Sequence, residues 1–190
     1  MTRRIENLIS KTMLAAALVA VPGAMFAETK SVAQERAEVD AALAKKVRHE
    51  LVMLPWLGVF DNLAYRVEDG VVTLSGQTIR PTIRSSAGNI VKRMEGVKQV
   101  VNNIEVLPLS RFDDDIRIRV ARAVYGYPAL QRYGLGAQPP IRIVVKNGEV
   151  VLEGVVANEF DRNVAFLRAN GVGGVFQVTN KLRVEGKRDL

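Results

Sequence analysis

Side chains able to do acid–base, nucleophilic or metal chemistry are scarce in this sequence. The chain has no cysteine, and His49 is its only histidine. It contains neither a Gly-x-Ser-x-Gly nucleophile elbow nor a phosphate-binding P-loop. His49 lies off the apolar stripe of its predicted helix, which favours a surface position over a general base or a ligand. We therefore expect no enzyme: no catalytic residue, no cofactor and no metal.

Two short motifs still need an interpretation. Asp113, Asp114 and Asp115 would be a candidate metal site, but consecutive residues of a helix point in different directions. They come at the start of a predicted helix, where capping and the helix dipole favour negative charge. Gly-Val-Gly-Gly at 171–174 precedes a strand and lacks the helix N-terminus that phosphate loops use. We interpret it as a helix-ending turn.

The sequence segments that would form the helices and strands occur twice in the chain. "VEDGVVTLSG" at 67–76 matches "VKNGEVVLEG" at 145–154, an offset of 78 residues. "GVKQVVNNIEV" at 96–106 matches "GVFQVTNKLRV" at 174–184 with the same offset. Two copies are too few for a solenoid, but each is long enough to form a small domain. The chain is a tandem duplication.

Upstream of these blocks the offset changes. "VRHELVMLPWL" at 47–57 matches "VARAVYGYPAL" at 120–130 with an offset of 73 residues. The second copy therefore carries five extra residues, which fall within "QRYGLGAQPP" at 131–140. The glycine and proline content of that segment predicts a loop.

The first helix of each copy is predicted from apolar spacing. Residues recur every three or four positions, which places them on one helix face: Leu43, Val47, Leu51 and Leu54, and then Ile116, Val120, Val124 and Tyr127. Asp-Gly at 69–70 and Asn-Gly at 147–148 supply the positive φ angles of a two-residue turn, so each joins two antiparallel strands.

A second helix is predicted at 81–94 and at 159–170, and the last strand coincides with the Gly-Val-x-Gln-Val block. Each copy thus has the order helix, strand, strand, helix, strand. We expect an α+β fold of two tandem αββαβ domains. Each would be a three-stranded mixed sheet with two helices packed on one face.

The hairpin pattern V-x-(D/N)-G-x-V-x-L-x-G, followed by a helix and then G-V-x-x-V-x-N-x-(I/L)-x-V, resembles the BON domain. Two such domains behind a leader resemble the OsmY family of osmotically inducible periplasmic proteins. The resemblance implies an αββαβ fold, an envelope location, no catalytic activity and association with phospholipid membranes, supporting the envelope under osmotic stress. The structural glycines of the motif are Gly70, Gly76, Gly96, Gly148, Gly154 and Gly174.

The N-terminus has the pattern of a secretory signal peptide. Arg3, Arg4 and Lys11 precede an uncharged apolar run at 13–21, and cleavage is expected near Ala27. The run is shorter than the about 20 residues of a membrane span, although an uncleaved N-terminal anchor is the alternative. The expected organisation is signal peptide 1–27, N-terminal segment 28–38, domain 39–107, linker 108–112, domain 113–186 and tail 187–190.

Charge and location together define the expected partners. Removing residues 1–27 takes away three basic residues and one acidic residue, and lowers the net charge from +7 to +5. For a periplasmic protein the nearby acidic partners are anionic lipid headgroups and other envelope polyanions, and nucleic acid is not expected. Without a lipobox cysteine, the mature protein is not expected to be lipid-anchored.

The first helix of the second copy carries most of the candidate lipid-binding residues. With its core stripe turned inward, Ile118 and Tyr125 point outward and Arg122 lies beside them. Guanidinium groups pair with lipid phosphates, while aromatic and aliphatic side chains enter the headgroup region. The full hypothesis names Trp56, Arg117, Ile118, Arg119, Arg122, Tyr125 and Tyr133.

These residues also have structural interpretations. Ile118 and Tyr125 would pack against the sister domain or a short N-terminal segment, and Trp56 would be partly buried beneath its own loop. The competing functional hypothesis is an envelope protein that binds a protein partner through the same patch, in a holdase-like manner and without lipid.

Overall fold

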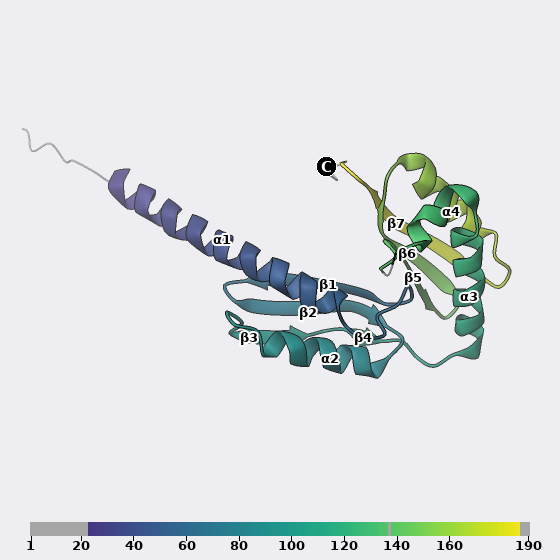
Figure 1. Cartoon of the computed structure of the whole chain (residues 1–190), viewed down its shortest axis with the longest axis horizontal. Helices are drawn as coiled ribbons and strands as arrows, with labels where there is room; N and C mark the ends of the chain where they lie inside the picture. The colour runs from purple at the N-terminus through teal and green to yellow at the C-terminus, as the bar shows by residue number, and fades with distance from the viewer. Residues whose placement is uncertain (1–22, 137, 187–190) are drawn as a thin grey trace, which may run out of the picture. The chain divides into compact units, whose positions relative to one another are not determined.

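A computed structural model of the chain describes residues 23–136 and 138–186. Most of the predicted signal peptide, residues 1–22, and the tail 187–190 therefore lie outside the described residues. The described residues fall into two units, with the boundary between Glu35 and Arg36. Both repeats belong to the second unit, apart from the start of the first helix, α1 (Gly23–Val52) (Figure 1).

The first repeat continues from α1 with a hairpin, a helix and a divided last strand. Its elements are β1 (Asn62–Glu68), β2 (Val71–Thr78), α2 (Pro81–Lys92), β3 (Gln99–Asn102) and β4 (Glu105–Val106). The second repeat has the same order with one addition, the short helix η1. Its elements are α3 (Arg111–Tyr125), η1 (Pro128–Gly134), β5 (Ile141–Lys146), β6 (Glu149–Val156), α4 (Glu159–Asn170) and β7 (Gln177–Val184).

Both sheets have the same topology and register. In the first, β2 pairs antiparallel with β1 and parallel with β3, and in the second β6 pairs in the same way with β5 and β7. Leu74 pairs with Asn102, and Leu152 pairs with Asn180, so the parallel register is identical in the two repeats. Strand β4 also pairs with β2, which makes it a continuation of β3 after a short interruption.

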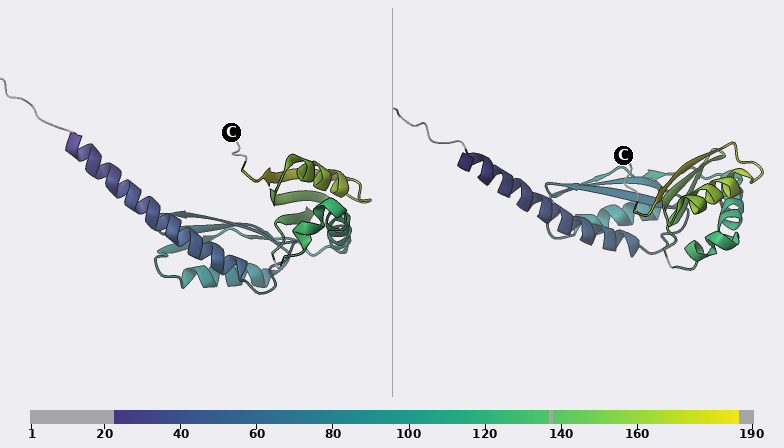
Figure 2. Two further views of the ribbon diagram at one scale, coloured as in Figure 1. Left: turned by 45° about the horizontal axis from the view of Figure 1, so that its top comes forward. Right: turned by 90° about the horizontal axis from the view of Figure 1, so that it is seen from above.

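The helices of each repeat cover one face of its sheet, as the views in Figure 2 show. The first core joins residues of α1, β2 and α2, and the second joins residues of α3, α4 and all three strands. These two cores consist mainly of Leu, Ile and Val at the predicted stripe positions, including Leu43, Val47, Leu51, Ile116, Val120 and Val124. The expected α+β fold of two αββαβ domains is confirmed.

The two hairpin turns are those that the sequence predicts. Asp69 and Gly70 have φ angles of 50° and 78°, and Asn147 and Gly148 have φ angles of 53° and 79°. Two consecutive residues with positive φ form the turn whose twist matches the flanking strands. Glycine is needed for a different reason at 154, where an added Cβ would lie 1.8 Å from the carbonyl oxygen of Pro140.

Asp113 and Asp114 lie in the first turn of α3, as predicted, but they do not cap the helix. Ser110 caps the helix, since its Oγ accepts a hydrogen bond from the amide of Asp113 at 3.2 Å. The Asp113 carboxylate is buried and accepts from the hairpin amides of Asn147 at 3.0 Å and Gly148 at 2.8 Å. Asp113 therefore ties α3 to the β5–β6 turn instead of capping the helix.

Element ends also differ from the sequence-based boundaries. Leu54 is buried but lies beyond the end of α1, and Tyr127 lies beyond the end of α3. Helix α2 ends at Lys92 rather than residue 94. The segment predicted as a loop at 131–140 begins inside η1, so the first part of that segment is helical.

A loop of the first repeat completes the second. Val59 and Phe60 pack against the core of the second repeat. The carbonyl oxygen of Val59 accepts from the amide of Ile143 in β5 at 2.9 Å, and that of Gly58 accepts from Arg142 Nη1 at 2.8 Å. We call residues 58–61 the bridging loop. It pairs with the edge of β5, so the two repeats are not independent along the chain.

Candidate functional site

The structure places two of the predicted lipid-binding arginines in internal contacts. Arg117 is only 2% exposed, and its Nη2 donates to the carbonyl oxygen of Val145 at 2.6 Å. Arg119 donates from Nη1 to the carbonyl oxygen of Gly173 at 2.7 Å and forms an ion pair with Asp115. Arg117 is therefore a core residue that cannot reach a lipid phosphate. The guanidinium group of Arg119 is occupied by contacts within its own domain.

The two predicted tyrosines are also structural. The hydroxyl of Tyr125 donates to the carbonyl oxygen of Ile141, and burial raises its pKa above the usual range, an effect that nearby Arg142 partly offsets. The hydroxyl of Tyr133 donates to Asp161 at 2.6 Å. The prediction that Tyr125 points outward is wrong, because η1 and the start of β5 pack beside the end of α3.

Three predicted residues remain on the surface: Ile118, Arg122 and Trp56. Ile118 is 46% exposed on α3, and the side chain of Arg122 makes no hydrogen bond or ion pair within the described part of the chain. Trp56 is 78% exposed, so the expected partial burial beneath its own loop is wrong. The seven candidates therefore do not form one site.

The backbone of Trp56 is unusual. Its φ angle is 69°, a left-handed conformation that costs a bulky residue about 1–2 kcal/mol. Arg80 Nη1 donates to the Trp56 carbonyl oxygen at 2.6 Å. Asp61, which is buried, accepts from the amide of Gly58 at 2.9 Å and from Thr78 Oγ1 at 2.7 Å. These contacts hold the loop at the tryptophan and just after it, and the Trp56 side chain is exposed.

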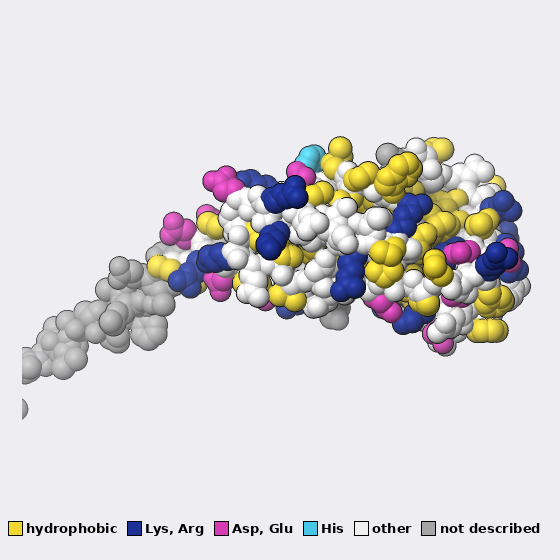
Figure 3. All heavy atoms as spheres, turned by 90° about the horizontal axis from the view of Figure 1, so that it is seen from below, with side chains coloured by type: hydrophobic (Ala, Val, Ile, Leu, Met, Phe, Trp, Pro, Cys, Tyr) yellow, Lys and Arg dark blue, Asp and Glu magenta, His cyan; other side chains and the backbone are white. Residues whose placement is uncertain are grey.

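The second repeat exposes a set of large apolar side chains, of which sequence reasoning predicted Ile118 and missed the other four. At matched positions the first repeat carries smaller or polar residues. The pairs, second repeat first, are Phe112 and Val39, Ile118 and Lys45, Phe160 and Thr82, Leu167 and Asn89, and Phe176 and Lys98. We call the five second-repeat residues the second-domain apolar set. Figure 3 shows hydrophobic side chains gathering toward the end of the surface that the second repeat forms.

Two members of this set meet at the hairpin end of the second domain. The rings of Phe112 and Phe176 lie 5.9 Å apart between centroids, tilted by 34°. Both approach the turn glycine Gly148, where an added Cβ would lie 2.6 Å from the Phe176 ring. At the equivalent place in the first domain, Gly70 is covered instead by the aliphatic part of Lys98. The comparison of the two copies would have identified this aromatic pair from the sequence.

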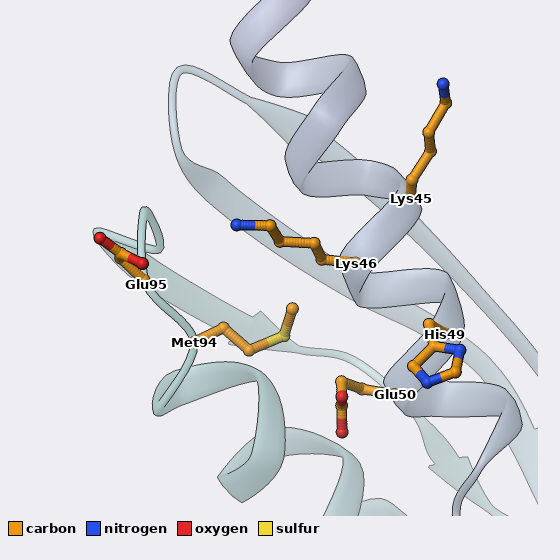
Figure 4. A pocket seen from close by; sticks show the side chains of 6 residues that line it. All are labelled: Lys45, Lys46, His49, Glu50, Met94 and Glu95. Carbon is orange, nitrogen blue, oxygen red and sulfur yellow. The ribbon is translucent and has the colours of Figure 1, made fainter.

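A groove of about 420 Å³ lies between α1 and the loop that follows α2 (Figure 4). Lys45, Lys46, His49 and Glu50 line it from α1, and Met94 and Glu95 line it from the loop. Lysines and glutamates balance one another in this groove, and Figure 4 shows Lys45 pointing away from Met94. His49 is exposed, as predicted.

No group of acidic, histidine or cysteine residues within the described ranges is arranged to hold a metal ion. Among the helices of residues 23–136 and 138–186, none combines the length and apolar character needed to cross a bilayer.

The fold and surface define a protein of two tandem αββαβ domains, the second of which exposes large apolar side chains. The BON domain family matches residues 39–108 and 113–186, and the chain belongs to this family. BON domains are linked to association with membranes or the cell envelope, and proteins that contain them are generally non-catalytic.

Two solved structures of CdsD, a structural protein of the type III secretion system of Chlamydia trachomatis, are similar to this chain. One, of the C-terminal domain, has 13% identity, covers 73% of this chain and 94% of that chain, and has a TM-score of 0.25. The other has 15% identity, covers 75% and 91%, and has a TM-score of 0.27. No curated protein sequence matches the chain.

Proposed function

We propose that this protein is a non-catalytic periplasmic protein that associates reversibly with anionic phospholipid membranes and supports the envelope under osmotic stress. The observation that carries this proposal is the second-domain apolar set. Five matched positions differ between two copies of one fold, so the fold itself does not require the large apolar residues. Two of these side chains, Phe112 and Phe176, are in contact with each other, and contiguous exposed apolar side chains mark contact surfaces.

The composition of the surface favours lipid. Arg111 and Arg122 are exposed on the same helix as Phe112 and Ile118. Apolar side chains beside arginines allow insertion into the headgroup region and pairing with phosphate in one contact. Each basic residue near an anionic surface contributes about 1 kcal/mol, so binding should be weak and sensitive to salt.

The test is co-flotation of residues 28–190 with anionic and with zwitterionic vesicles, at low and high salt. Within the part of the protein that the structure describes, the buried core residues lie between Leu43 and Leu182, so residues 28–190 retain both cores. The informative variant carries Phe112→Val and Phe176→Lys, the residues of the first copy at those positions. It should bind anionic vesicles more weakly than the parent, although it gains a positive charge.

The matched control places the reverse changes, Val39→Phe and Lys98→Phe, in the first repeat, and should not weaken binding. The contribution of charge is measured by comparing Arg122→Glu with Lys46→Glu. Both substitutions lower the net charge by two, and Lys46 is an exposed residue of α1. A parent protein that fails to float with anionic vesicles at low salt would overturn the proposal. The same surface would then point to a protein partner in the envelope.

A further inference from the structure

A run of ten uncharged residues, "LVMLPWLGVF" at 51–60, joins α1 to β1. The structure gives parts of this run clear internal roles. Leu51 and Leu54 are buried in the core of the first domain. Val59 and Phe60 pack against the core of the second domain. Leu57 also packs against the core of the first domain. Packing within the protein therefore explains these five residues of the run, but not its other large apolar side chains.

Three large apolar side chains of the run face outward: Val52, Met53 and Trp56. We propose that these residues form a second membrane contact, located in the first domain, in which the Trp56 ring enters the interfacial layer of an anionic phospholipid bilayer. This inference rests on the proposed function and assigns it a second site, separate from the second-domain apolar set.

The loop that carries Trp56 is preorganised in the free protein. Trp56 adopts a left-handed backbone conformation, and Arg80 binds its carbonyl oxygen at 2.6 Å. The neighbouring turn is fixed by Asp61, which binds the amides of Gly58 at 2.9 Å and Ile79 at 3.1 Å. Because the loop is fixed, little conformational freedom is lost when the ring meets a surface.

The charges around the ring match an anionic surface. Arg80 is bound to Trp56 itself, and Arg48 lines a cavity of about 160 Å³ together with Val52. Asp61, the acidic residue closest in sequence after the run, is buried and accepts several hydrogen bonds, so it presents no free carboxylate. Glu50, just before the run, lines the groove beside His49.

The size and chemistry of the patch favour lipid over protein. Three side chains supply much less than the ~800 Å² that each partner of a standard protein complex buries. Tryptophan is enriched at membrane–water interfaces, where its ring is in apolar surroundings and its N–H remains hydrated. A small apolar patch with a basic border is therefore suited to interfacial insertion.

Trp56 is the only tryptophan, so its fluorescence reports this site alone. Residues 28–190 are titrated with phosphatidylglycerol-containing vesicles and with phosphatidylcholine vesicles, while flotation of the same samples measures binding. We expect emission typical of a hydrated indole in the free protein. A shift to shorter wavelength, together with quenching by lipids brominated on their acyl chains, is expected with anionic vesicles.

A second test uses a variant that retains Trp56, so that its fluorescence can still be measured. Met53→Glu places a charge in the exposed patch and should weaken anionic vesicle binding roughly tenfold, the loss expected for one inserted apolar side chain. Val39→Glu makes the same change in charge at an exposed position earlier on α1, and should reduce binding much less.

The outcomes separate the two proposals. Flotation together with a blue shift supports a membrane contact at Trp56. Flotation without any change in Trp56 emission overturns this contact and leaves the proposed function intact. Absence of flotation overturns both. A blue shift produced by a protein partner, in a sample that does not float with lipid, also overturns the membrane contact.

Discussion

Asp40 and Asp113, 73 residues apart, make the same contact in the two domains. Asp40 accepts hydrogen bonds from the hairpin amides of Asp69 at 2.7 Å and Gly70 at 3.1 Å, as Asp113 does from its own turn. Each carboxylate thereby fixes the first helix of its domain to the tip of the hairpin, from within α1 in the first domain and from the first turn of α3 in the second. The duplication has preserved this contact together with the turn that it holds.

The two aspartates should differ in their contribution to stability. Asp113 is buried, so Asp113→Ala leaves two amides without a partner and should lower the free energy of unfolding by about 3 kcal/mol. Asp40 is only half-buried, and water can replace its carboxylate, so Asp40→Ala should cost about 1 kcal/mol. Urea unfolding of residues 28–190 measures both. Equal losses would show that burial does not control this contact.

Gly154 should be intolerant of any side chain. Its φ angle is 125°, and an added Cβ would lie 1.8 Å from the backbone oxygen of Pro140. Gly154→Ala must shift the β5–β6 hairpin and should destabilise the second domain by at least about 3 kcal/mol. Gly186 also has a positive φ, but nothing lies within 4 Å of its Cβ position. Gly186→Ala, the control, should cost about 1 kcal/mol or less in thermal unfolding.

The bridging loop should stabilise the second domain from outside its own repeat. Phe60→Ala removes a ring from the second core and should cost about 1–3 kcal/mol. The Ile143 amide donates a hydrogen bond to the carbonyl oxygen of Val59, and its hydrogen exchange should be faster in Phe60→Ala than in the parent protein. Phe160→Ala makes the same change at an exposed site and should have almost no effect. Slow exchange retained in Phe60→Ala would contradict the loop's role.

Tyr125 should make stability depend on alkaline pH. Burial raises the pKa of its hydroxyl above the ordinary value of about 10, so the folded state retains a proton that the unfolded chain loses. This stabilising contribution is complete below pH 10. It is lost as pH rises above 10, by at most about 1.4 kcal/mol per pH unit.

The comparison for this prediction is Tyr125→Phe. That variant loses the hydrogen bond to Ile141 and should be about 1 kcal/mol less stable at neutral pH. Above pH 10 its free energy of unfolding should fall less steeply than that of the parent. Parallel curves would mean that Tyr125 titrates equally in both states.

The fold was predictable because its signals are local and occur twice. Turns such as Asn147-Gly148 require positive φ, and helix stripes such as Ile116, Val120 and Val124 follow from periodicity. The candidate site was less predictable because the direction of a side chain on an isolated helix does not reveal its neighbours. Arg117 turns inward to the carbonyl oxygen of Val145, a contact that exists only once β5 has packed against α3.

The exposed aromatic residues were missed for a different reason. Periodicity assigns large apolar residues to the core, and Phe176 lies before β7 without any pattern that marks it as exposed. Only Lys98 at the matched position in the first copy shows that the fold accepts a hydrophilic residue there. An internal duplication thus provides a comparison within one chain, and it identifies the positions at which the fold does not require the residue that one copy carries.

The bridging loop also limits how this chain can be rearranged. Cutting at the linker between the repeats would separate β5 from Val59, its neighbour along the sheet edge, and leave a strand edge open to pairing with other chains. The exchangeable unit is therefore not the second repeat as the duplication defines it. A recombination event or an engineered fusion that moves the second repeat must carry residues 58–61 with it, or supply another segment to close that edge.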